Sequence, residues 1–276
     1  MVFTQKMYSS AARTNLSSQC VTIDYQVIGE GKFRTAYSGT YIGGNRNQQA
    51  AVCKCFKGHF RALENEYFAS DFMIADKAIQ YAEEWNRICA GDEKILITRG
   101  DVHTIAGTQY MVEPLIRNFT KFTSNNGWIS DENGWEDEAM AAFTHFTYHR
   151  SGGHLIVCDL QGRYRDNSRF GNNSKSRFEL TDVAICSRNR SYGPTDLGEK
   201  GINSFFHNYS RNQFSDMDGR WQMPRQTRQW FPKSSSTSMM RSSDAHLLSL
   251  NYQSTFRPGF DGILEEDYDS SDSYDY

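Results

Sequence analysis

The sequence has few of the features that mark secreted, membrane or nucleic-acid-binding proteins. Its six cysteines are scattered and include no C-x-x-C pair, which indicates reduced thiols and not a disulfide framework. No apolar run approaches the length of a membrane span, and residues 1–20 lack the basic-then-apolar order of a signal peptide. The 30 basic and 33 acidic residues nearly cancel, so no overall field attracts nucleic acid. We therefore expect a cytoplasmic protein with no membrane or nucleic-acid partner.

Composition divides the 276 residues into four parts. Polar, serine-rich residues 1–19 predict a flexible leader, and serine-rich and acidic residues 221–276 predict a largely disordered tail. The stretch between them is long enough for a two-lobed domain, with an N-terminal lobe over 20–116 and a C-terminal lobe over 117–220. The boundary follows Glu113-Pro114, because proline fixes its own φ and holds the preceding residue extended.

Periodicity predicts an α+β fold. Polar and apolar residues alternate over 21–27, and a strand pattern returns over 33–42 after a glycine turn, which predicts a hairpin. Residues 64–88 contain no proline or glycine and carry Phe68, Phe72, Ala75, Ile79 and Ala82 at helical spacing. Further strands are predicted at 50–56, 95–98, 102–105, 109–116 and from residue 155, and helices over 136–150 and after residue 201; the residues between 162 and 180 are interpreted as an inserted loop.

Two acidic residues follow predicted strands. The run 155–158 leads to Asp159, Gln161 and Gly162, and a shorter apolar approach leads to Asp182. Two carboxylates brought to one pocket repel each other unless a cation lies between them, and Mg²⁺ prefers such hard oxygen ligands. The alternative is a strand that ends in a capping aspartate and a turn glycine.

Lys54 lies in the middle of the otherwise apolar strand 50–56. A lysine there is costly unless its ammonium reaches an anion, although an edge strand could also turn it toward water. Residues 193–201 form a glycine-bearing loop that includes Gly198 and Gly201. Its backbone amides could cradle an anion, but such a loop is often only a turn.

Several short motifs in order give the chain a resemblance to the alpha-kinase family of atypical protein kinases, which includes elongation factor kinase, myosin heavy chain kinases and channel-kinases. H-R-D and D-F-G, the motifs of ordinary protein kinases, are absent from the sequence. The motifs that carry the resemblance are Gly31-Lys32-Phe33-Arg34, Val52-Cys53-Lys54, Val112-Glu113-Pro114, Lys121 with Ser124-Asn125-Asn126-Gly127, Phe143-Thr144-His145, Asp159-Leu160-Gln161-Gly162, Leu180-Thr181-Asp182 and Asp196-Leu197-Gly198-Glu199-Lys200-Gly201.

The resemblance implies a two-lobed kinase-like fold, with an antiparallel N-lobe sheet and one long helix beside a mixed α/β C-lobe. It also implies transfer of the ATP γ-phosphoryl group to serine or threonine of a protein substrate. By this analogy Asp159 and Lys54 are catalytic, and Gln161 and Asp182 hold Mg²⁺. The residues that the analogy assigns to the nucleotide are Arg34, Lys54, Glu113, Lys121, Gly198 and Gly201.

The chain departs from the family at its structural zinc site, which uses two histidines and two cysteines. His145 matches one ligand, whereas the other positions align with Tyr209, Arg211 and Ser215. One ligand does not make a tetrahedral site, so we predict no zinc and a histidine that a neighbour satisfies. Besides an active kinase, the sequence leaves open a nucleotide-binding pseudokinase and a metal-dependent phosphohydrolase. The oligomeric state and the protein substrate stay open.

Overall fold

A computed structural model describes residues 6–7, 20–31, 33–88, 93–166, 176–215, 220–232 and 238–240. An antiparallel sheet in the order β1-β6-β7-β4-β3-β2 forms the N-terminal lobe. Its strands are β1 (Lys6–Met7), β2 (Cys20–Glu30), β3 (Arg34–Ile42), β4 (Ala50–Phe56), β6 (Asp101–Ile105) and β7 (Thr108–Pro114).

The register of β4 on β7 determines what faces the space between the lobes. Val52 lies opposite Glu113, and Lys54 lies opposite Met111. Since side chains alternate along a strand, Lys54 and Glu113 lie on the same face, while Cys53 and Val112 point into the core of the sheet. The hairpin predicted over residues 21–42 and the strands predicted over 50–56 and 109–116 are all present.

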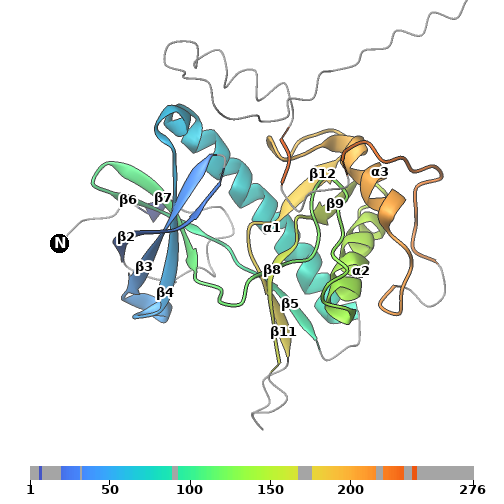
Figure 1. Ribbon diagram of the computed structural model, residues 1–276, viewed down its shortest axis with the longest axis horizontal. Coiled ribbons are helices and arrows are strands. Elements are labelled where there is room, and N and C mark those ends of the chain that lie inside the picture. The colour runs from blue at the N-terminus through green and yellow to red at the C-terminus, as the bar shows by residue number, and fades with distance from the viewer. Residues whose placement is uncertain are drawn as a thin grey trace, which may run out of the picture.

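Helix α1 (Glu64–Ile88) joins the two lobes. It follows a short 3-10 turn, Gly58–Leu63, and Figure 1 shows it crossing from the N-terminal sheet to the C-terminal lobe. Phe68 and Phe72 pack with the apolar cluster under β4, whereas Ile74, Ala78 and Trp85 belong to the core of the C-terminal lobe. The buried face therefore changes along the helix, and the predicted positions Ala75 and Ile79 are only partly buried.

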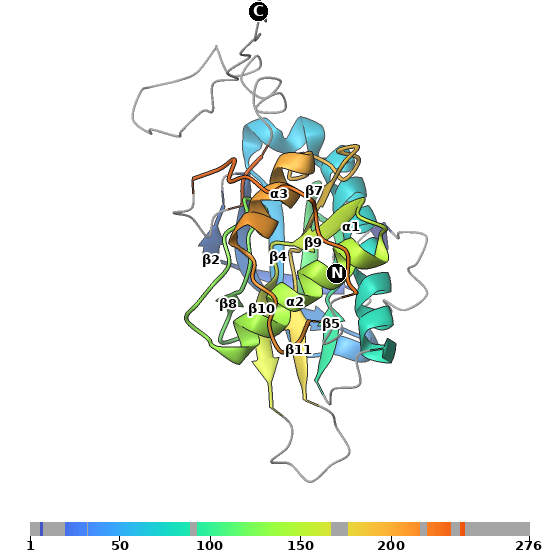
Figure 2. The same cartoon turned by 90° about the vertical axis from the view of Figure 1, so that its right-hand side faces the viewer.

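The C-terminal lobe contains a four-stranded sheet in the order β5-β11-β10-β8 and a separate β12-β9 pair. Helices α2 and α3 lie on the side of this lobe away from the N-terminal sheet (Figures 1 and 2). The elements are β5 (Lys94–Ile97), β8 (Thr120–Lys121), α2 (Trp135–Arg150), β9 (Leu155–Cys158), β10 (Gln161–Arg165), β11 (Arg177–Leu180), β12 (Ala184–Ser187) and α3 (Gly198–Asn208).

Three expectations from the sequence need correction. Strand β5, assigned to the N-terminal lobe, pairs in parallel with β11 and so belongs to the C-terminal sheet. The expected loop after Gly162 is in part a hairpin, because Arg163 and Tyr164 of β10 pair with Glu179 and Phe178 of β11. Its ion pairs, such as Arg163 with Glu179 at 2.6 Å, let an arginine-rich segment form a strand.

The third correction concerns the first residues of the expected disordered tail, which the structure describes as packed. Residues 220–232 pack on the C-terminal lobe: Trp221 lies against Trp85 and Phe146, and Phe231 is buried beside α3. Aromatic side chains supply enough apolar area to order a segment that is otherwise polar. Most of the leader and residues 241–276 lie outside the described residues. No helix in the described ranges is both long and apolar enough to cross a bilayer.

The cysteines in the described ranges are free thiols, in keeping with the sequence. Cys53, Cys55, Cys158 and Cys186 are buried, and the Sγ atoms of Cys158 and Cys186 lie 3.8 Å apart between β9 and β12. Burial raises the pKa of the Cys158 thiol well above its ordinary value. These thiols therefore act as small apolar side chains of the core.

Candidate active site between the lobes

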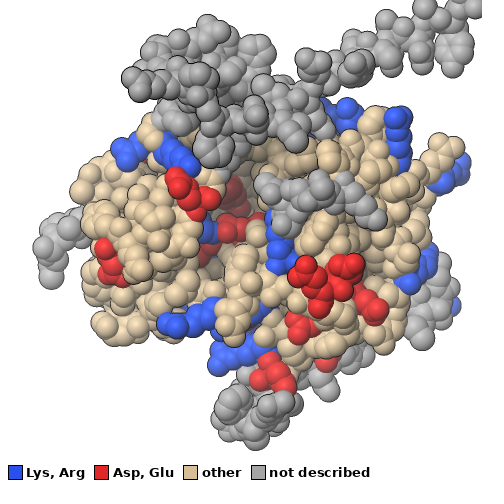
Figure 3. Space-filling model, in the orientation of Figure 1, with Lys and Arg blue, Asp and Glu red and all other residues tan. Residues whose placement is uncertain are grey.

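The candidate site lies where β4 and β7 of the N-terminal lobe face the loops that follow β9 and β11. Figure 3 shows acidic and basic side chains gathered in a hollow between the two lobes. Lys54 provides the central contact: its Nζ donates to Glu113 Oε2 at 2.7 Å and also pairs with the Asp182 carboxylate. A bond between a β4 lysine and an aspartate 128 residues further along the chain joins the two lobes directly.

The charges of this triad set the protonation of its members. Burial alone lowers the pKa of Lys54, but the carboxylates of Asp182 and Glu113 outweigh it and raise that pKa above its ordinary value. Burial raises the pKa of Glu113, although Lys54 opposes the rise. Desolvation also acts on Asp182, yet Lys54 and Arg34 hold its pKa below the ordinary value. Lys54 and Asp182 are thus a charged pair in the folded protein.

Asp159 forms a second ion pair in the same cleft. Its side chain is nearly fully buried, and its Oδ1 lies 2.5 Å from Nζ of Lys121 on β8. Burial raises the pKa of Asp159 above its ordinary value, and Lys121 limits that rise. A carboxylate held in this way is a stronger proton acceptor than a solvated aspartate.

The backbone of both aspartates is left-handed, with φ of 58° at Asp159 and 52° at Asp182. Non-glycine residues rarely adopt this conformation, which surrounding contacts must maintain. The backbone N–H of Leu160 donates to Thr123 Oγ1 at 3.1 Å, and that of Thr181 donates to the Gln161 carbonyl at 3.0 Å. These bonds hold the turn after each strand and aim both carboxylates into the cleft.

Gly162 and Gln161 connect the two turns. A Cβ at residue 162 would lie 1.9 Å from the carbonyl oxygen of Glu179, so only glycine permits β10 to approach β11 here. The side-chain amide of Gln161 donates to the backbone oxygen of Asp182 at 3.0 Å. The D-x-Q-G segment therefore forms a turn, as one interpretation of the sequence predicts, and it also directs polar side chains into the cleft; a chemical role for Asp159 and Gln161 stays a prediction.

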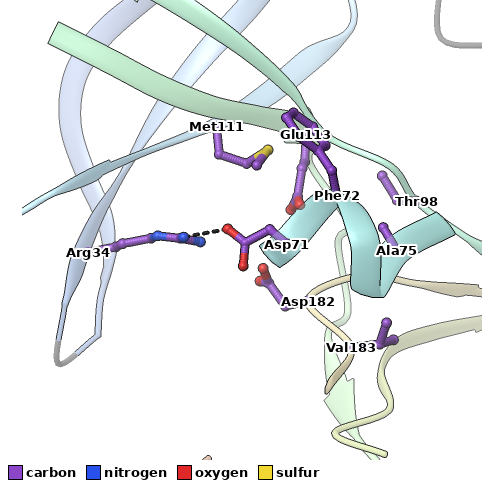
Figure 4. A pocket seen from close by; sticks show the side chains of 10 residues that line it. Arg34, Asp71, Phe72, Ala75, Thr98, Met111, Glu113, Asp182 and Val183 are labelled. Atoms are coloured by element: carbon purple, nitrogen blue, oxygen red, sulfur yellow. Dashed lines mark hydrogen bonds and ion pairs between the residues drawn. The ribbon is translucent and has the colours of Figure 1, made fainter. Parts of the chain in front are cut away.

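Arg34 reaches the edge of the site. It pairs with Asp71 of α1, and Figure 4 shows the carboxylates of Glu113 and Asp182 directed toward the same pocket. Its guanidinium also lies 4.3 Å from the ring centroid of Phe56. A wider cleft of about 660 Å³ opens beside Pro114. It is also lined by Ala50, which lies on the same face of β4 as Lys54.

Gly198 and Gly201 do not join this cluster. Both lie in the first two turns of α3 and not in a loop, and both are buried. The N–H of Gly198 donates to Asp196 Oδ1 at 2.9 Å, while the same carboxylate accepts from Ser187 and Tyr192. The expected amide cradle is present, but it holds an internal carboxylate. A nucleotide role for the two glycines stays a prediction.

Sequence reasoning missed three residues of the site. Thr181 donates to Glu113 Oε2 at 2.7 Å, and Asp71 is the partner of Arg34. Asn125 is fully buried and donates to the carbonyls of Thr195 and Met239. Thr181 and Asn125 stand inside two of the quoted motifs, so only the position of Asp71, seven residues into α1, gave no signal.

His145 lies apart from the cleft, with both ring nitrogens engaged. Nε2 lies 2.9 Å from the Gln222 carbonyl and must donate to it, and Nδ1 lies 3.3 Å from the Tyr209 hydroxyl. That hydroxyl also bonds Ser215. Three of the four positions that align with zinc ligands, His145, Tyr209 and Ser215, thus form a hydrogen-bonded network. The described residues contain no group of three or more metal-binding side chains.

Comparison with known proteins gives a family match and several relatives. The model of the alpha-kinase family matches residues 29–215. Alpha-protein kinase vwkA of Dictyostelium discoideum is 28% identical over 63% of this chain and 25% of its own length. Transient receptor potential cation channel subfamily M member 6 of Homo sapiens is 33% identical over 34% of this chain and 4% of its own length. This chain spans a quarter or less of these curated relatives.

Solved structures share the fold. The alpha-kinase domain of myosin heavy chain kinase A in complex with AMP has a TM-score of 0.58 and 21% identity, over 70% of this chain and 87% of that one. An alpha kinase from Entamoeba histolytica has a TM-score of 0.55 and 20% identity, over 71% and 80%. The two-lobed α+β fold predicted from the sequence is thereby confirmed.

Proposed function

Because this chain belongs to the alpha-kinase family, we propose that it transfers the γ-phosphoryl group of ATP to serine or threonine hydroxyls of a protein substrate. One observation carries the proposal: Lys54 from one lobe is held between Glu113 and Asp182, in the cleft that also contains Asp159. Phosphoryl transfer depends on positioning and charge neutralisation, and this set of groups provides both.

Lys54 and Arg34 are the groups we assign to the phosphates. The pKa of Lys54 is raised, so its ammonium stays charged in the buried cleft. Arg34 lines the adjacent pocket with Asp182 and offers a planar fork of donors. The adenine of ATP would then lie toward Pro114, where the two lobes meet, along the face of β4 and β7 that carries Ala50, Lys54 and Glu113.

Asp182 and Gln161 fit a magnesium ion. A carboxylate and an amide supply hard oxygen ligands, the bond from Gln161 to the Asp182 backbone keeps the two side chains together, and the Asp182 side chain retains 40% of its exposure in the cleft. Magnesium takes few protein ligands and adds phosphate oxygens and water. When bound, it would neutralise charge on the transferred phosphoryl group.

Asp159 is the proposed acceptor of the substrate hydroxyl proton. Its Oδ1 is held by Lys121, and burial raises its pKa toward the range in which a carboxylate can take up a proton. Lys121 would stabilise the carboxylate before the transfer and the developing negative charge nearby during it. A cytoplasmic location is part of the same proposal.

The first test is transfer of labelled γ-phosphate from Mg-ATP to a generic basic protein. We expect labelling by the wild-type chain, on serine and threonine by phosphoamino-acid analysis, and a loss of roughly 10²–10⁴-fold in Asp159→Asn. Asp131→Asn is the matched control, because Asp131 is an exposed aspartate outside the cleft. Equal labelling by wild type and Asp159→Asn would refute the role of Asp159.

Two other outcomes would redirect the proposal. Binding of ATP in a thermal-shift assay without any transfer would indicate a pseudokinase that senses nucleotide. Release of free phosphate without labelled protein would indicate a phosphohydrolase that uses Asp159 and Asp182. Each outcome is distinguishable from inactive protein, because the first needs a ligand-dependent shift and the second needs turnover.

A further inference from the structure

A short segment of the chain after residue 237 lies in the candidate site. The hydroxyl of Ser238 donates to Oδ2 of Asp159, and Nζ of Lys121 donates to the same hydroxyl oxygen at 3.2 Å. A serine hydroxyl is therefore bound to the carboxylate that we assign as proton acceptor. This is the arrangement that an acceptor hydroxyl needs before transfer.

The backbone of the next residue is held by Asn125. Its Nδ2 donates to the Met239 carbonyl at 2.8 Å, and its Oδ1 accepts from the Met239 N–H at 2.9 Å. One amide side chain thus pairs with both polar groups of one peptide residue. A contact of this kind aligns a backbone without reading its side chain, and Asn125 is fully buried and itself fixed by the Thr195 carbonyl.

The Met239 side chain adds an apolar contact. It packs against the cluster of buried residues under α3, which includes Phe205 and Ile202. The Ser238 hydroxyl, the Met239 backbone and the Met239 side chain are therefore each bound at a separate point. A non-specific surface contact would not hold all three. The two residues occupy the site as a bound peptide does.

We propose that Ser238 is an acceptor for the chain's own kinase activity, phosphorylated within the same molecule. The inference rests on the proposed function. Oγ of Ser238 attacks the γ-phosphorus of ATP, the bond from that phosphorus to the β,γ-bridging oxygen breaks, and ADP leaves. The hydroxyl proton goes to Asp159 Oδ2 and then to solvent, so that one ATP and one serine give ADP and one phosphoserine.

The product does not fit where the serine does. A phosphoserine carries between about −1.5 and −2 charges at pH 7, and here it would stand beside the buried Asp159 carboxylate. The single ammonium of Lys121 already pairs with Asp159 and offsets only part of this charge, so repulsion would displace the segment and break its bonds to Asn125. Phosphorylation of Ser238 thus empties the acceptor position for an external substrate.

The test incubates the full chain with labelled Mg-ATP and maps phosphate by mass spectrometry, with a basic protein substrate in a parallel reaction. We expect phosphate on Ser238 at a rate per molecule that stays constant over a hundredfold dilution. Ser238→Ala loses this label, Ser238→Thr keeps it as phosphothreonine, and Ser210→Ala, a change at an exposed serine after α3, leaves it intact.

A second readout follows the segment itself, and its first measurement, in the nucleotide-free chain, needs no turnover. Hydrogen exchange of the Met239 amide should be slow in the nucleotide-free chain and faster by on the order of tenfold after phosphorylation, because two hydrogen bonds to Asn125 are lost. Fast exchange before phosphorylation would overturn the proposal.

The outcomes separate the two proposals. A labelled basic protein with unlabelled Ser238 would refute the acceptor role and leave the kinase function standing, as would a rate on Ser238 that rises with protein concentration. Absence of label on both the basic protein and the chain itself would refute the kinase function, and with it the acceptor role, even if the Met239 amide exchanges slowly. Slow exchange with a labelled basic protein and no label on Ser238 would mean that the segment only blocks the site.

Discussion

The interlobe cleft and the His145 network hold buried polar groups in opposite ways. In the cleft, Lys54 shares its ammonium between the carboxylates of Glu113 and Asp182. Around His145, the imidazole, the Tyr209 hydroxyl and the Ser215 hydroxyl form a chain of hydrogen bonds that includes no carboxylate and no ammonium. The charged side chains of the cleft can therefore bind an anion or a cation that enters it. The polar groups of the His145 network form their hydrogen bonds with each other.

The surroundings differ in the same sense. The His145 ring is edge-on to Phe206, Tyr209 and Trp221, with centroids between 5.1 and 5.3 Å away. In the cleft, both aspartates have left-handed φ angles and Asp182 is partly exposed. Aromatic packing without backbone strain is typical of a structural centre, and strained, solvent-reaching charges are typical of a working site. Substitutions in the two regions should therefore affect different properties.

The largest effect is expected for Lys54→Met. Loss of the ammonium leaves Glu113 and Asp182 facing each other without their shared cation and removes the group assigned to the phosphates. We expect kcat/KM for phosphoryl transfer to fall by roughly 10²–10³-fold. Steady-state transfer to a basic protein measures this loss. Lys57→Met is the matched control, because Lys57 pairs with exposed Glu30 at the edge of the sheet.

His145→Ala tests the other side of the comparison. The fully buried ring loses three aromatic neighbours and its bonds to Tyr209 and Gln222, so we expect the free energy of unfolding to fall by about 2–4 kcal/mol. Below the melting transition, kcat/KM should change by less than about twofold. Urea denaturation and transfer assays measure the two quantities, with exposed His154→Ala as control. A large loss of kcat/KM in folded His145→Ala would break the comparison.

Local pattern predicted most elements, because alternation and helical spacing report which side chains are buried nearby. It could not predict that β5 pairs with β11, since the partner lies more than 80 residues away in the sequence. It predicted the buried face of α1 correctly at Phe68, Phe72 and Ala82 but not at Ala75 and Ile79. The helix leaves one core and enters another, so its buried face rotates between Phe72 and Ile74. One set of apolar residues at helical spacing predicts the buried face correctly only when the helix packs against a single core.

The sequence predicted the candidate site residues where a polar side chain interrupts or directly follows an apolar run. Lys54, Asp159 and Asp182 are polar residues in or just after apolar runs, and the structure brings all three into one cleft. The contact of Ser238 with Asp159 was not predictable, because the two residues are 79 positions apart and a serine in a serine-rich segment carries no local signal.

A third prediction concerns pH and sharpens the description of the cleft. Burial raises the pKa of Asp159, and Lys121 opposes the rise, so Lys121→Met should raise that pKa further. Since the ionised carboxylate is the form that we propose accepts the proton, the acidic limb of the kcat/KM profile should move to higher pH. We expect roughly tenfold lower kcat/KM at the acid end and a smaller loss near pH 8. An unmoved limb would mean that another group controls it.

The smallest effect is expected for Tyr209→Phe, which removes one hydroxyl from the His145 network and keeps the ring. The ring stacks on Phe205 and lies near Phe206, so the apolar contacts persist. The bonds from the hydroxyl to His145 and Ser215 are lost, and a neutral hydrogen bond contributes about 0.5–1.5 kcal/mol. We therefore expect a loss of about 1–2 kcal/mol in urea denaturation and an unchanged pH profile. Since the cleft depends on charge, a shifted profile in Tyr209→Phe would show that the two regions are coupled.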